Sequence, residues 1–84
     1  DYKTAIEWHK KSLKTTENLN IQGYIRAVQL GGYGETLVKV EDNANALNYL
    51  NQAIAMLKMS APTNQYLARF EKLVNKLSSI DSSP

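Results

Sequence analysis

The chain contains no cysteine, so neither disulfide bonds nor thiolate metal sites can hold it together. At 84 residues it is one small domain or a piece of a larger protein, and its stability has to come from packed apolar side chains. The lack of cysteine fits a reducing compartment, which makes the cytoplasm the default expectation for its location.

Strong charge and long apolar runs are also absent. Ten basic and eight acidic side chains leave a net charge of +2, which is too small to indicate a nucleic-acid-binding protein. No apolar run approaches the roughly 18 residues that a membrane span needs, and no signal sequence opens the chain. We therefore expect neither direct nucleic-acid binding nor membrane insertion.

Glycine is scarce, and three of the four glycines lie in the stretch LGGYGETLVKV, residues 30–40. Out of context this stretch looks like the phosphate-covering loop of a kinase. Such a loop needs flanking strands and a lysine on a following strand, and a P-loop needs Gly-Lys-Ser/Thr, none of which is present. We predict that Gly31 and Gly34 allow close helix packing, with a flexible kink as the alternative, and that Gly32 faces a side where a bound chain could approach. No cofactor is expected.

Apolar residues recur at the helical spacing of 3, 4 and 7 in four segments, and no segment alternates with a period of two. We predict helices over 1–17, in a helical hairpin over 20–59, and over 62–80, followed by a frayed tail at 81–84. The connections are short, so consecutive helices should be antiparallel neighbours. The prediction is an all-α fold.

The predicted helices repeat along the chain. A shift of 41 residues places Ala5 on Ala46 and Trp8 on Tyr49, and a shift of 40 places Leu30 on Phe70. A two-helix unit with a period near 40 is typical of an α-solenoid, in which each pair buries its apolar face by stacking on the next. The equivalence of Trp8 and Tyr49 predicts that both rings pack within the repeat.

The first fourteen residues, DYKTAIEWHKKSLK, resemble the second helix of a tetratricopeptide repeat. The matching positions are Asp1, Tyr2, Ala5, Ile6, His9, Ser12 and Leu13. Leu30 and Gly31 resemble the Leu-Gly pair of a first helix in that family. The unit is longer than the usual 34 residues, which is similar to the extended repeats of bacterial signalling and regulatory proteins.

The resemblance implies a tetratricopeptide-like solenoid fragment of antiparallel helix-turn-helix units. In this reading 1–17 is the second helix of a repeat that lacks its first, 20–59 is one complete hairpin, and 62–80 is a following or capping helix. The chain is then expected to be part of a longer array.

The resemblance also implies a non-enzymatic module that binds a protein or peptide within a larger signalling or regulatory protein. First helices line the concave groove in that family, where cationic and amide side chains often hold acidic groups of a peptide. The groove residues carried over are Val28, Gln29, Gly32, Glu35, Thr36, Arg69, Lys72 and Lys76. The alternative for the last helix is a cap whose cationic face is only solvated.

No catalytic or metal-binding set is visible in the sequence. His9 is the only histidine, so a metal site could be completed only by carboxylates, and we expect His9 to pack in an aromatic position. No cysteine or second histidine could activate a serine. We expect no enzymatic activity.

Self-association is the second functional hypothesis, from a different class. The helix that carries Trp8 would pack on a missing segment or on another copy of the chain, because an exposed apolar solenoid end tends to associate. The chain would then be a homo-oligomerisation element of a larger signalling protein or transcription regulator, forming a homodimer through its exposed end.

Overall fold

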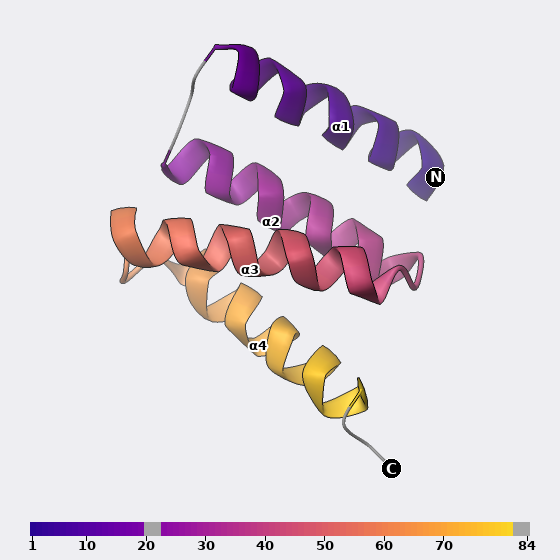
Figure 1. Ribbon diagram of the computed structural model, residues 1–84, viewed down its shortest axis with the longest axis vertical. Coiled ribbons are helices and arrows are strands. Elements are labelled where there is room, and N and C mark those ends of the chain that lie inside the picture. Colours follow the sequence, from indigo (N-terminus) through magenta and orange to yellow (C-terminus); the bar gives the residue numbers. More distant parts are fainter. Residues whose placement is uncertain (20–22, 82–84) are drawn as a thin grey trace.

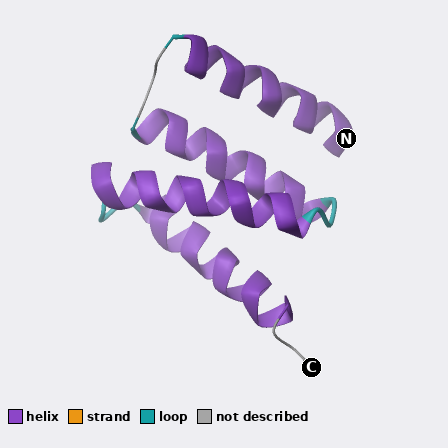
Figure 2. Cartoon of the chain, viewed as in Figure 1, coloured by secondary structure: helices purple, strands orange, loops and turns teal. Residues whose placement is uncertain are grey.

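The computed structural model describes residues 1–19 and 23–81 of the chain, with side chains described as far as residue 79. Its elements are α1 (Tyr2–Asn18), α2 (Tyr24–Lys39), α3 (Asn43–Ser60) and α4 (Gln65–Asp81) (Figure 1). Every regular element in these two ranges is a helix (Figure 2). The prediction of an all-α fold with four helices is confirmed.

Successive helices run in opposite directions and pack side by side. In Figure 1, α1 and α4 lie at opposite edges, and α2 and α3 lie between them. The most extensive helix contact joins α2 to α3, while α1 packs on α2 and α4 packs on α3. The described structure measures 44 × 31 × 16 Å, so it is flat rather than round.

The core lies around α2 and α3, because each of these helices has neighbours on two sides. Leu50, Leu57 and Phe70 are its largest fully buried side chains. In α1, which packs against α2 alone, Thr16 is the one buried side chain. The other buried apolar residues are Ala27, Leu30, Tyr33, Leu37, Ala46, Ala53, Leu67 and Leu77.

Two glycines of α2 permit this packing, as predicted. A Cβ atom on Gly31 would overlap the ring of Phe70, which reaches α2 from α4. A Cβ atom on Gly34 would lie 2.8 Å from Leu50 Cγ and 3.2 Å from the backbone oxygen of Ala46 in α3. Gly31 and Gly34 therefore lie within a helix and allow α3 and α4 to approach it closely. They do not form a nucleotide-binding loop.

The helix boundaries differ slightly from the predicted ones. α4 begins at Gln65 rather than at residue 62, because the Asn64 side chain caps it: Oδ1 accepts a hydrogen bond of 2.7 Å from the backbone N–H of Tyr66. Asp81, placed in the predicted tail, is the last residue of α4. The start of the predicted hairpin, residues 20–22, and the rest of the tail, residues 82–84, lie outside the described residues.

Candidate functional site

A hollow of about 400 Å³ lies over α2 and is lined by three helices. We call it the three-helix hollow. Its floor comes from one stripe of α2, and α1 and α4 each contribute to a wall. The lining residues are His9 from α1, Gly32, Glu35, Thr36, Val38 and Lys39 from α2, and Arg69 and Leu73 from α4.

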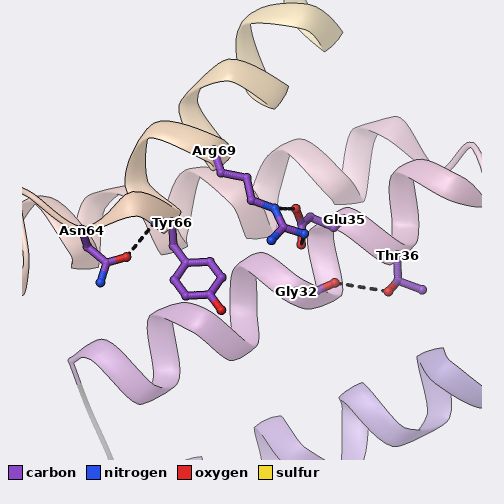
Figure 3. Close-up of polar contacts among 6 residues, drawn as sticks. All are labelled: Gly32, Glu35, Thr36, Asn64, Tyr66 and Arg69. Atoms are coloured by element: carbon purple, nitrogen blue, oxygen red, sulfur yellow. Dashed lines mark hydrogen bonds and ion pairs between the residues drawn. The ribbon is translucent and has the colours of Figure 1, made fainter.

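An ion pair crosses from α4 to α2 at this hollow (Figure 3). The Arg69 guanidinium donates two hydrogen bonds to the Glu35 carboxylate, 2.6 Å from Nε to Oε2 and 3.0 Å from Nη2 to Oε1. Paired, charge-assisted hydrogen bonds of this kind fix both side chains in one orientation. Arg69, one of the predicted groove residues, is therefore already paired within the chain, and Glu35 balances its charge.

A smaller hollow of about 230 Å³ adjoins the first along α4. We call it the lysine hollow, because it adds Lys72 and Lys76 to Glu35, Arg69 and Leu73. The two lysines are four residues apart and therefore project from the same face of α4. Within the described residues neither lysine has an ion-pair partner, so both ammonium groups are available to an anion.

His9 joins α1 to the wall of the three-helix hollow. Its Nε2 lies 3.0 Å from Thr36 Oγ1, and the Thr36 hydroxyl itself donates to the Gly32 carbonyl over 3.2 Å. The Thr36 hydroxyl thus links the imidazole of α1 to the backbone of α2. The ring stacks on Tyr33 at 5.6 Å between centroids, and partial burial lowers the His9 pKa from 6.5.

Aromatic contacts continue from α1 through α2 into α3. Tyr33 also contacts Tyr49, with the ring centroids 4.6 Å apart. The pKa of Tyr33 is raised, first by burial and then by the charges of Tyr49, Asp42 and Glu7. The predicted packing of His9 and Tyr49 is confirmed. The predicted packing of Trp8 is wrong, because its side chain is 68% exposed.

The structure brings together most of the predicted groove residues. Four of them line the three-helix hollow (Gly32, Glu35, Thr36 and Arg69), and the lysine hollow adds the two lysines of α4. Gln29 lies elsewhere, in a separate hollow against α1. Val28 is half-buried and lines none of these three hollows.

Sequence reasoning missed Val38, Lys39 and Leu73 as lining residues and assigned His9 to packing alone. Lys39 follows Thr36 by three residues and Glu35 by four, a spacing that places it on the same face of α2. That signal was present in the sequence. The contribution of His9 depends on how α1 crosses α2, which no local pattern specifies.

The two hollows together favour an anionic ligand. They are lined by four cationic side chains (Lys39, Arg69, Lys72 and Lys76) and one carboxylate (Glu35). Lys39 also lies 6.0 Å from the centre of the Tyr2 ring. No group of three or more His, Cys, Asp or Glu side chains suited to a metal ion occurs within residues 1–19 and 23–79.

None of α1 to α4, as far as the chain is described, is long and apolar enough to cross a membrane. Comparisons with protein-family models, with curated proteins and with solved structures found no match to this chain.

Proposed function

We propose that this chain is a tetratricopeptide-like helical repeat module that binds an extended acidic segment of a partner protein, within a larger signalling or regulatory protein. The observation that carries the proposal is the pair of adjoining hollows over α2 and α4. They combine exposed ammonium groups with apolar side chains along one continuous surface. The activity is binding, without a chemical step.

The spacing of the helices supports the repeat. α1 and α3 begin at Tyr2 and Asn43, and α2 and α4 begin at Tyr24 and Gln65, a separation of 41 residues in both cases. Buried positions recur as well, since Leu30 and Phe70, which the 40-residue shift superposes, are both core residues. A repeated two-helix unit whose copies share a buried face is the structural basis of a solenoid.

The contacts available to such a segment follow from the lining. Val38 and Leu73 are partly buried and offer apolar surface. Lys72 and Lys76 are neighbours on one face of α4, since residues at i and i+4 of a helix lie side by side. They would pair with alternate carboxylates of the extended segment, which share one side of it. A ligand carboxylate that reaches Arg69 has to compete with Glu35. The Arg69–Glu35 pair, which lines both hollows, would therefore weaken the binding of a carboxylate at that point relative to one placed beside Lys72 or Lys76.

The test is fluorescence polarisation with a labelled peptide of alternating leucine and glutamate, measured at low and high salt. A leucine and glutamine peptide of the same length serves as the neutral probe. We expect the acidic peptide to bind more tightly and its affinity to fall with salt, because exposed ion pairs are screened.

Reversing two charges of the lysine hollow, Lys72→Glu with Lys76→Glu, should weaken binding of the acidic peptide at least about tenfold. The matched control is Lys10→Glu with Lys14→Glu, which makes the same charge change at the same spacing on the exposed surface of α1, away from both hollows. Equal losses in the two double variants would show that net charge alone draws the peptide and would contradict the proposed site.

A further inference from the structure

His9 lies in the wall of the three-helix hollow and is uncharged near neutral pH. Its side chain is partly exposed and lines the hollow from α1. Partial burial lowers its pKa from 6.5, so the imidazole of the protein alone is neutral near pH 7. The peptide contacts proposed above use the lysines and the apolar side chains of this surface, and they leave His9 without a role.

One of the two ring nitrogens of His9 already has a partner. Nε2 lies 3.0 Å from Thr36 Oγ1, whereas no hydrogen bond joins Nδ1 to any described residue. A protonated imidazole carries an N–H on both nitrogens, and a hydroxyl oxygen can accept from one of them while it donates its own proton to a carbonyl. The bond from Thr36 to the Gly32 carbonyl is therefore compatible with protonation of His9, which adds a donor at Nδ1.

The charged groups that share the hollow with His9 come from α2 and α4. They are Glu35 and Lys39 of α2 and Arg69 of α4. Because Glu35 and Arg69 balance each other, the Lys39 ammonium group is a positive charge in excess. A like charge nearby disfavours a second cation, so Lys39 opposes protonation of His9 until an anion enters the hollow.

The other elements around the imidazole add no charge of their own beside it. On α1 itself, the positions three and four residues from His9 are Ala5, Ile6, Ser12 and Leu13. Tyr33 of α2 stacks on the ring, and Tyr49 of α3 contacts Tyr33. Tyr33 is neutral near pH 7, since burial first, and then the charges of Tyr49, Asp42 and Glu7, raise its pKa from 10.0.

We propose that His9 is a further binding residue of this surface and takes up a proton from solvent when the acidic segment binds. A carboxylate of the segment enters the three-helix hollow and accepts a hydrogen bond from Nδ1, while Nε2 stays on Thr36. The carboxylate offsets the charge of Lys39 and favours the protonated imidazole. This inference rests on the proposed function, because it assigns a second contact to the same acidic ligand.

Binding and protonation are then linked. The gain in affinity begins near the His9 pKa of the complex, increases as the pH falls, and is complete below the lower pKa of the protein alone. Glutamate side chains stay mostly ionised down to about pH 5.5, so the peptide keeps its own charge over this range. An acidic peptide should bind about three- to tenfold more tightly at pH 5.5 than at pH 7.

The first experiment is an NMR titration of the 84-residue chain between about pH 5 and pH 8, alone and with the leucine and glutamate peptide in excess. Because His9 is the only histidine, one imidazole Cε1–H signal reports its pKa. We expect the acidic peptide to raise that pKa and the leucine and glutamine peptide to leave it unchanged. An equal pKa with and without the acidic peptide would overturn the proposal, and this measurement needs no variant.

Fluorescence polarisation at about pH 7 and pH 5.5 tests the linkage through affinity. His9→Gln keeps a hydrogen-bonding side chain that does not titrate, and should lose the tighter binding at low pH. The control adds Asn18→His to His9→Gln, which returns one imidazole to α1 at an exposed position outside the hollows of α1, α2 and α4. If that control restored the pH dependence, net charge would be its cause and the His9 contact would be refuted.

The outcomes separate this contact from the proposed function. If the acidic peptide binds and Lys72→Glu with Lys76→Glu weakens it, but the parent chain and His9→Gln respond equally to pH, the acidic ligand stands and the His9 contact is wrong. If the acidic peptide binds at neither pH, both proposals are wrong.

Discussion

Adjacent glycines in α2 should respond in opposite ways to the same substitution. A Cβ atom on Gly31 would overlap the ring of Phe70, which is only 1% exposed and has no free space to move into. A Cβ atom on Gly32 would have a single neighbour outside its own helix, His9 Cε1 at 3.7 Å, an ordinary van der Waals distance. Gly31→Ala and Gly32→Ala are therefore a matched pair within one helix.

The magnitudes follow from two effects. Replacing a glycine by alanine inside a helix stabilises the fold by about 0.5–1 kcal/mol, because the unfolded chain loses conformational freedom. Overpacking a core costs about 1–3 kcal/mol, and direct overlap with a buried ring places Gly31→Ala near the upper end. We expect Gly31→Ala to lower the free energy of unfolding by about 2 kcal/mol and Gly32→Ala to raise it by about 0.5–1 kcal/mol.

Urea unfolding followed by far-UV circular dichroism measures the difference in the free energy of unfolding directly, provided that parent and variants have the same m-value. Repeating Gly31→Ala in a Phe70→Leu background removes the ring and should recover much of the loss, which a double-mutant cycle would show as coupling. If Gly31→Ala were as stable as Gly32→Ala, the ring of Phe70 would not pack against α2 at Gly31, and the described core would be wrong at this position.

Two further predictions concern the helix ends and the imidazole. Asn64→Ala should lower the free energy of unfolding by about 0.5–2 kcal/mol, because the backbone N–H of Tyr66 loses its acceptor at the start of α4; the neighbouring Thr63→Ala, at an exposed position, is the control for urea unfolding. The free energy of unfolding should also fall as the pH drops below 6.5, since the lowered pKa of folded His9 means that the unfolded chain takes up the proton first, and the loss should end at the folded pKa. His9→Gln should lack this dependence between about pH 7 and pH 5, and an identical slope in parent and variant would contradict a lowered pKa for the partly buried imidazole.

Much of the fold follows from local pattern. The 3, 4, 7 spacing of apolar residues indicated four helices, because each helix must bury one face and apolar residues at this spacing lie together on that face. The same spacing indicated that Gly31 and Gly34 face other helices, and both do so. Helix starts were less accurate, since Asn64 rather than Pro62 determines where α4 begins, through a single side-chain hydrogen bond.

The site was predicted only in part, for a physical reason. Residues of one helix that share a face, such as Glu35, Thr36 and Lys39, can be grouped from their spacing alone. Whether Arg69 is free or paired depends on the position of α4 relative to α2, and the structure pairs it with Glu35. Sequence spacing has no information on that distance.

What the sequence determined by itself is therefore the helical class, the buried face of each helix and the absence of disulfide or thiolate chemistry. Tertiary structure decided which faces meet: it placed His9 beside Thr36, balanced Arg69 with Glu35, and left Trp8 exposed. The division has a simple cause. Helical periodicity is a property of the local chain, whereas these contacts depend on the distances and angles at which separate helices pack.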